Sequence, residues 1–338
     1  MTIKDVAEYS GVSIATISRV LNNHPDVREE VRAKVLKAIE ELHYVPNVSA
    51  RDLGKVQTDT IGVVVRGVGN PFLNSVLRAI EKAVNKANYS MVMSQISSGE
   101  DELYEGASLV RSKRLKGLIF LGGRFDYTPE QTAALGVPFV CCTYTNSFGS
   151  LNKNSYSSVY IDDYAEAFRS VKALTDLGHK KIAVLLATPT DRSISELRFK
   201  GYCDALASAG IQLDRSLMIE ADSYNIDDAF VAVEKFLEKN RDFTAMFSIA
   251  DAMGMAAIKA LYNAGIKVPE DCSLISIDGI EISKYTIPTL TTFVQPSEEI
   301  GKEAVEILID LLDNKGKTRQ LKVETVLREG GTLAKPKA

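Results

Sequence analysis

Near the amino terminus, one face of a predicted helix has the side chains of a surface that reads DNA. Ile17, Val20 and Leu21 form an apolar stripe at helical spacing and mark the buried side of this helix. The opposite face has no acidic residue and consists of Ser13, Ile14, Ala15, Thr16, Ser18, Arg19 and Asn22. Arginine binds guanine edges in the major groove, and small apolar groups contact thymine methyl groups. We therefore expect this face to contact DNA bases.

A helix-turn-helix is the predicted scaffold for this face. Thr2, which we also place at the DNA, is a candidate N-cap of the first helix, and Gly11 supplies the turn. Ser13 caps the second helix, and Asp26 is a candidate cap for a third. The third helix closes a small core with an apolar stripe of Val31, Val35, Ile39 and Leu42.

The charge of this segment does not distinguish DNA binding from an ordinary amphipathic helix pair. Residues 1–55 contain eight Lys/Arg and eight Asp/Glu, whereas DNA-binding domains usually carry a basic surface. The acidic residues do gather at helix starts, away from the proposed reading face, as Asp5, Glu8, Asp26, Glu29 and Glu30.

Short apolar runs alternate with helical patterns from Ile61 onward, which predicts doubly wound parallel α/β sheets. Predicted strands are 61–65, 90–95, 117–121, 138–142, 159–161, 181–186, 217–219, 245–249 and 273–277. Predicted helices are 72–87, 164–177, 196–209, 227–238, 253–264 and 298–312. These strands are too many for one small sheet, and a Ser/Asn-rich break lies near 147–158. We expect two lobes, with the chain returning to the first near 291–295.

Composition fits an ordinary globular protein of two or three domains. The 338 residues are 45% hydrophobic and 25% charged, with a net charge of −4, so any DNA contact must be local. The four cysteines lack metal or redox spacing, and no apolar run approaches the ~20 residues of a membrane span. We expect a cytoplasmic protein that does not contact membranes.

Signals of catalysis are incomplete. Gly67 and Gly69 lack the third glycine of a dinucleotide loop, and Leu311 replaces the first glycine of a phosphate-binding loop ending at Thr318. The three histidines, at positions 24, 43 and 179, suggest no triad or metal cluster. We predict no enzyme activity, catalytic residue, metal or cofactor.

Residues 44–47 (Tyr-Val-Pro-Asn) and residues 50–53 (Ala-Arg-Asp-Leu) follow the predicted helix-turn-helix. Together these segments resemble the lactose repressor/galactose repressor family of bacterial regulators, and the resemblance continues over nearly the whole chain. It implies a hinge helix that inserts in the minor groove, with Asn47, Ala50 and Leu53 at the DNA. Leu53 would wedge between base pairs.

The resemblance also implies a periplasmic-binding-protein-like body with an effector cleft between its lobes. Ligands of open α/β sheets bind beyond the carboxyl ends of strands. Matching the family's motifs residue by residue places these side chains at the effector: Phe72, Leu73, Thr143, Arg198, Tyr224, Asp251, Asp278 and Gln295. In the family, the arginine holds ligand oxygens, the tyrosine stacks on a sugar and the aspartate at 278 accepts hydroxyl hydrogen bonds.

Three positions depart from the family's pattern. Leu73 replaces an aromatic residue, Thr143 stands where an acidic residue is common, and Ala250 replaces the asparagine before Asp251. The last two changes remove hydrogen-bonding groups, so we expect weak binding of simple hexoses and tighter binding of a bulkier ligand such as a glycoside.

The predicted molecule is a homodimeric, ligand-responsive repressor of carbohydrate-utilisation genes that binds a pseudo-palindromic operator. A regulator of nucleobase type, a solute-binding protein and an α/β enzyme are the alternatives. The expected domains are a head at 1–46, a hinge at 47–57 and a body at 58–338. Lobe 1 would span about 58–157 and 294–320, and lobe 2 about 158–293 and 321–338.

Overall fold

The computed structural model describes residues 3–21, 24, 26–42, 58–67, 69–97, 99–188 and 192–337. Its contacts divide the chain into two compact units, Met1–Gln57 and Thr58–Ala338, here called the head and the body. The proposed DNA contacts Thr2, Asn22, Asn47, Ala50 and Leu53 lie outside the described residues, as does the hinge helix. Within the described residues, no helix is both long enough and apolar enough to cross a membrane.

The described residues of the head form three helices: α1 (Ile3–Ser10), α2 (Ile14–Leu21) and α3 (Glu29–Glu41). Gly11 adopts a positive φ of 64° at the turn between the first two, which suits a residue without Cβ. Val6, Ile17, Val20, Val35 and Ala38 are buried together as the core of the head. The predicted helix-turn-helix is therefore present.

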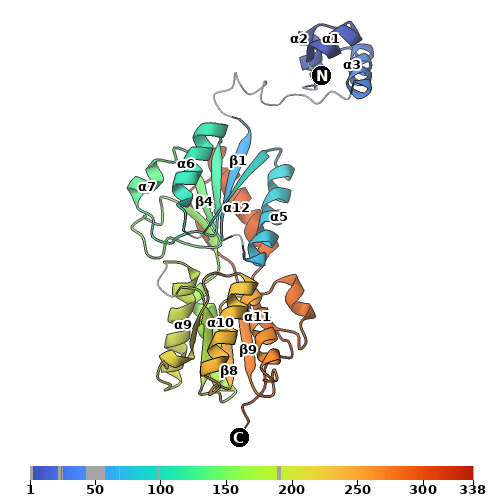
Figure 1. Ribbon diagram of the computed structural model, residues 1–338. Coiled ribbons are helices and arrows are strands. Elements are labelled where there is room, and N and C mark those ends of the chain that lie inside the picture. Colours follow the sequence, from blue (N-terminus) through green and yellow to red (C-terminus); the bar gives the residue numbers. More distant parts are fainter. Residues whose placement is uncertain are drawn as a thin grey trace. The chain divides into compact units, whose positions relative to one another are not determined.

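The described part of the body contains two six-stranded sheets, each of which defines a lobe (Figure 1). Lobe 1 has the strand order β11 (Gln320–Lys322), β5 (Ser157–Tyr160), β4 (Phe139–Cys142), β3 (Gly117–Leu121), β1 (Thr60–Arg66), β2 (Ser90–Ile96). Lobe 2 has the order β12 (Val326–Arg328), β10 (Thr291–Val294), β9 (Ser273–Asp278), β8 (Ala245–Ser248), β6 (Ile182–Leu186), β7 (Met218–Glu220). The strand pairs are parallel except for β10 with β12. This confirms the predicted α/β class.

Helices cover both faces of each sheet. In lobe 1, α5 (Pro71–Lys86) and α12 (Ser297–Leu312) pack together on one face, α6 (Glu102–Lys113) covers the other, and α7 (Pro129–Ala133) follows β3. In lobe 2 the helices pair as α8 (Asp163–Asp176) with α9 (Ile194–Ser208), and α10 (Ile226–Lys239) with α11 (Asp251–Asn263). Two 3₁₀ turns, η1 (Arg215–Leu217) and η2 (Glu281–Tyr285), complete this lobe.

The chain crosses between the lobes three times, after β5, β10 and β11. The expected return near 291–295 is confirmed, because α12 packs on lobe 1 directly after β10. The expected limits of the lobes shift by a few residues. The break at 147–158 belongs to lobe 1, where the Tyr156 hydroxyl binds the backbone N–H of Asn146, and the crossing comes after Tyr160.

Gly201 allows α8 and α9 to pack closely. A Cβ at this position would overlap the carbonyl oxygen of Tyr164 and lie 2.9 Å from the Cβ of Ala167. Gly254, inside α11, has more room, since its nearest neighbours would be 3.4–3.5 Å from a Cβ. The two helical glycines of lobe 2 therefore differ in what they permit.

We expect Gly201→Ala to lower the free energy of unfolding by about 1–3 kcal/mol through overpacking. Gly254→Ala is the matched control and should be neutral or stabilising by up to about 1 kcal/mol, because alanine favours helix. Urea titrations followed by circular dichroism measure both. Equal effects of the two substitutions would show that the α8–α9 contact does not need glycine.

Candidate functional site: an interlobe cavity and a helix-turn-helix face

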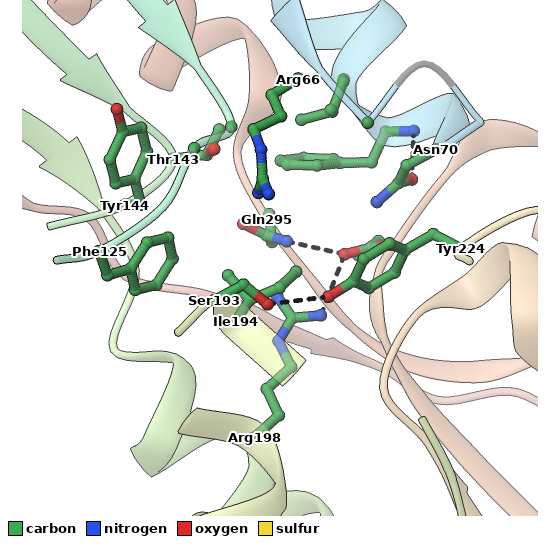
Figure 2. A pocket seen from close by; sticks show the side chains of 16 residues that line it. Arg66, Asn70, Phe125, Thr143, Tyr144, Ser193, Ile194, Arg198, Tyr224 and Gln295 are labelled. Carbon is green, nitrogen blue, oxygen red and sulfur yellow. Dashed lines mark hydrogen bonds and ion pairs between the residues drawn. The ribbon is translucent and has the colours of Figure 1, made fainter. Parts of the chain in front are cut away.

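A cavity of about 680 Å³, counted to its open mouth, lies between the lobes (Figure 2). It adjoins the carboxyl ends of β1, β3, β4 and β9, where ligands of parallel sheets bind. The lining residues are Arg66, Gly67, Asn70, Phe72, Leu73, Gly122, Gly123, Phe125, Thr143, Tyr144, Ser193, Ile194, Arg198, Tyr224, Asp278 and Gln295.

Arg198 is the central polar group of the lobe 2 wall. Its guanidinium is 1% exposed, and its Nε and Nη2 lie 2.9 and 2.8 Å from Asp163 Oδ1. Nη1 donates to the carbonyl oxygen of Ile249 and lies 3.5 Å from Asp278 Oδ1. One buried cation therefore serves two buried carboxylates, which is costly unless each charge is paired.

Asp278 keeps one oxygen available. Its Oδ1 accepts a 2.8 Å hydrogen bond from the Gln295 side chain, whereas Oδ2 is buried and has no hydrogen-bond partner among the described residues. A buried carboxylate oxygen without a partner is unfavourable, and a donor from a ligand would relieve this. The residue also has a positive φ of 134°, as Thr143 has at 78°, and such backbone outliers gather at functional sites.

Burial controls the protonation of the two carboxyl groups. It raises the pKa of Asp278 to about 7 and that of Asp163 to about 6, although the charge of Arg198 favours the ionised form of both. Asp278 therefore titrates near neutral pH.

Aromatic rings form much of the apolar wall. Phe125 and Tyr144 stack with centroids 5.1 Å apart, and Phe72 is buried beside Leu73 at the start of α5. On lobe 2, the Tyr224 hydroxyl lies 3.4 Å from Ser193 Oγ. Flat apolar rings among a few polar groups are typical of sites for small polar ligands.

Arg66, at the end of β1, places a second guanidinium at the cavity (Figure 2). Its Nε lies 3.5 Å from Oε2 of Glu102, a carboxylate that is itself 1% exposed. Glu102 also accepts hydrogen bonds from the Tyr127 hydroxyl and the Arg124 backbone. Tyr127 continues the chain to Tyr144, with 2.9 Å between their hydroxyls. These contacts link Arg66 and Tyr144, two residues that line the cavity on lobe 1, through the buried Glu102 and Tyr127.

The two lobes touch on either side of the cavity. On one side, the backbone N–H of Phe125 donates to the carbonyl oxygen of Arg192 over 2.9 Å. On the other, the Asn225 side-chain oxygen occupies the place that a Cβ on Gly69 would take. The structure thus shows the lobes in contact around the site.

Seven of the eight side chains proposed for the effector line the cavity: Phe72, Leu73, Thr143, Arg198, Tyr224, Asp278 and Gln295. Asp251 does not, and its assignment is corrected. Its Oδ1 accepts from the hydroxyls of Ser276 and Thr292, and its Oδ2 from Ser283 and the backbone of Ile280. Because all these donors belong to lobe 2, Asp251 holds that lobe together.

Ala250 is also fully buried outside the cavity.

Arg66, Phe125, Tyr144 and Ser193 line the cavity but were not predicted. A basic residue at the end of the apolar strand Ile61–Val65 was a usable signal for Arg66. Phe125, Tyr144 and Ser193 lie in loops, whose course the sequence pattern does not specify.

The proposed reading face of α2 is largely open to solvent. Ser13, Ile14, Ala15, Ser18 and Arg19 are exposed, and Thr16 is half-buried. Ser13 caps the helix by accepting the backbone N–H of Thr16 at 3.2 Å.

Asp26 takes a different role from the predicted cap of α3. It lies 2.6 Å from His24 Nδ1 and 3.6 Å from the Arg19 guanidinium. The helix begins only at Glu29. Among the described residues, no cluster of His, Cys, Asp or Glu is arranged to hold a metal ion.

Comparison with known proteins identifies the two parts. Residues 2–47 match the model of bacterial regulatory proteins of the lacI family, and residues 171–333 match the periplasmic binding protein-like domain. The chain is 37% identical over 334 residues to the HTH-type transcriptional regulator MalR of Clostridium butyricum, covering 97% of this chain and 98% of that protein.

Two solved structures are similar over nearly the whole chain. The Lac repressor dimer bound to operator and the anti-inducer ONPF has a TM-score of 0.77 at 27% identity, covering 98% of both chains. The complex of the transcriptional regulator CelR with cellobiose has a TM-score of 0.71 at 27% identity, covering 98% of this chain and 99% of that one.

A helix-turn-helix head joined to a two-lobed ligand-binding body defines a DNA-binding transcription regulator. The chain belongs to the lacI family of such regulators.

The titration of Asp278 leads to a prediction about stability. Because its pKa rises from 3.8 to about 7 on folding, the folded state holds a proton that the unfolded chain releases between these values. The free energy of unfolding therefore falls as pH rises through this window. We expect Asp278→Asn to be more stable than the wild type by about 1–3 kcal/mol at pH 8, and equal to it near pH 4.

Urea titrations at both pH values test this. Asp242→Asn is the control, since Asp242 is 77% exposed in its ion pair with Lys181 and should contribute little at either pH. An Asp278→Asn protein that is less stable at pH 8 would show that the buried charge is fully compensated.

In the head, we expect Arg19→Ala to cost about 1–3 kcal/mol of operator affinity and to relax base preference at one position of each half-site. Selection from random duplexes followed by sequencing measures the preference. Lys37→Ala, at an exposed site on α3, is the control and should leave base preference intact. An unchanged preference in Arg19→Ala would remove Arg19 from the reading face.

Proposed function

We propose that the chain is a homodimeric repressor whose operator affinity is controlled by a sugar or glycoside bound in the interlobe cavity. The proposal that the effector is a sugar rests on the buried Oδ2 of Asp278, which has no hydrogen-bond partner among the described residues and lies beside Arg198 and Gln295. Together these groups present an acceptor and nearby donors, as a ligand with neighbouring hydroxyls requires. The aromatic rings opposite them suit the apolar face of a sugar.

The operator is proposed to be pseudo-palindromic, because one helix-turn-helix reads one half-site and a two-fold dimer reads two. Exposed apolar side chains on lobe 2 support a second copy as partner. Ile282 is 58%, Tyr285 75% and Ile287 93% exposed, in and directly after η2. Such a group is unusual on the surface of a monomer.

Control of DNA binding follows from differential affinity. An effector that contacts both lobes favours the arrangement in which they are closed around it, and this shifts the population of dimer states. The groups available for such contacts are Arg66 and Thr143 on lobe 1 and Arg198 and Asp278 on lobe 2. We assign no chemical reaction to the chain, and we place it in the cytoplasm, where its DNA target lies.

A thermal-shift screen tests the effector class. A ligand that binds only the folded state raises the melting temperature. We expect sugars or glycosides to do so and purine bases not to. Stabilisation by hypoxanthine or guanine alone would favour a nucleobase effector instead.

Asp278→Asn tests the site. Loss of the carboxylate should raise the sugar concentration needed for the response by about tenfold or more, as expected for a lost hydrogen bond to a charged group. Operator affinity without sugar should stay within about twofold, since the head is a separate unit. Fluorescence anisotropy of a labelled operator measures both quantities. Asp242→Asn should respond like the wild type, and an equal response from Asp278→Asn would exclude Asp278 from the site.

A further inference from the structure

The end of lobe 1 that lies opposite the cavity carries an excess of positive charge. All strand pairs of this lobe are parallel, so the strands begin at this end and finish at the end where the cavity lies. The helix ends and loops that precede the strands contain nine Lys/Arg and two Asp/Glu, although the whole chain has a net charge of −4. We call this surface the basic edge, and its segments are 58–59, 86–89, 111–116, 133–138, 152–156 and 313–319.

Hydrogen bonds hold the segments of the basic edge side by side. The backbone N–H of Thr58 donates to the carbonyl oxygen of Arg114 over 3.1 Å. At the β5 and β11 side of the sheet, the Thr318 hydroxyl donates to the carbonyl oxygen of Asn154 over 2.6 Å. Because the strands that follow these segments belong to one sheet, the basic residues lie along a single edge of the lobe.

The positive charge of the basic edge is only partly neutralised within the lobe. Its two acidic residues each pair with one lysine of the edge. Arg111, Lys113 and Lys317 are exposed and make no ion pair with another described residue. The carboxyl ends of α5, α6 and α12 also lie here, and their helix dipoles favour nearby cations with about half a charge each. Nine basic residues exceed what these helix ends and two acids offset.

The chain enters the body at this same edge, because Thr58 begins the body and leads into β1. Residues 43–57 connect Thr58 to the last described residue of the head. DNA bound by the head is thereby tethered to the end of lobe 1 that carries the positive charge. The head itself is formally neutral, with eight Lys/Arg and eight Asp/Glu in residues 1–55, whereas duplex DNA attracts basic surfaces. The charge that the head lacks is therefore present where its linker joins the body.

We propose that the basic edge is a second DNA-binding surface, which binds phosphates of the duplex whose bases the head reads. Contacts to phosphates release counterions and add affinity without sequence information. The head then supplies the base preference, and the basic edge supplies much of the affinity that is independent of sequence. An acidic protein segment would also suit this charge, but DNA is the polyanion that the head of a lacI-family regulator brings to the chain.

The salt dependence of binding to mixed-sequence DNA tests the proposal. The probe is a labelled duplex of mixed sequence and about 60 base pairs, titrated with the full-length protein by fluorescence anisotropy between about 50 and 200 mM KCl. Arg111→Gln combined with Lys113→Gln should weaken binding about tenfold or more at the lowest salt concentration. The slope of log affinity against log salt concentration should become shallower by about 0.9 for each phosphate contact that is lost.

A matched pair of substitutions controls for total charge. Lys235→Gln combined with Lys239→Gln removes the same charge from exposed positions on α10 of lobe 2, and should leave both the affinity and the salt slope unchanged. Because all four altered side chains are exposed, the melting temperatures should stay equal to that of the wild type. Selection from random duplexes should return the same preferred sequence for both double variants, since phosphate contacts carry no base information.

Three results would overturn the proposal. An unchanged affinity and salt slope in the variant of the basic edge would show that this surface does not bind DNA, which is also the result expected if it docks an acidic protein. An equal loss in the α10 control would show that only total charge matters. A changed base preference would show that the substitutions act through the head. None of these measurements uses a sugar, so their outcome is independent of the proposed effector.

Discussion

The buried guanidinium of Arg198 is the interaction on which the body of this regulator depends. It pairs with Asp163, the first residue of α8, and approaches Asp278, the last residue of β9. It also binds the carbonyl oxygen at the end of the β8 segment, at Ile249. A charge removed from water requires such partners, so four segments of lobe 2 are fixed relative to one another at the cavity wall. The ligand-binding surface is therefore assembled by the same contacts that stabilise the lobe.

The buried charges around Arg198 are not fully balanced, which suits a protein that responds to a ligand. Two carboxylates share one cation, and one carboxylate oxygen has no partner among the described residues. Burial also raises the pKa of Asp278, because removal from water disfavours the charged carboxylate. The unpartnered carboxylate oxygen of Asp278 lies at the cavity, where a ligand can donate a hydrogen bond to it. Ligand binding would therefore offset part of the free-energy cost of burying this carboxylate.

Much of the architecture was predictable because its signals are local. Strands of a parallel sheet that are buried on both faces have continuous apolar sequences. Such sequences occur at Ile61–Val65, Gly117–Leu121 and Ile182–Leu186. The short edge strands β11 and β12 have three residues each and no comparable run, so they depend on neighbours distant in sequence. Helix α6 was also missed, because its buried side includes Glu102 and Gly106 in place of large apolar residues.

The site was partly predictable for a different reason. Arg198 and Asp278 follow motifs in sequence and lie on or beside regular elements, so their place in the cleft could be inferred. Asp251 stands at an equivalent strand end, yet its carboxylate turns to the hydroxyls of Ser276 and Ser283. That choice depends on side chains some 25 to 32 positions away in the chain, which no local pattern reveals.

The contacts between the lobes also influence how long a ligand stays bound. Phe125 meets Arg192 on one side of the cavity, and Gly69 meets Asn225 on the other. Separation of the lobes would break these contacts and widen the way out of the cavity, and domain motions of this kind take microseconds to milliseconds. Two effectors of equal affinity can thus have different residence times, if one of them strengthens these contacts. The duration of a transcriptional response would then be set at the edges of the cleft, by residues that need not touch the effector.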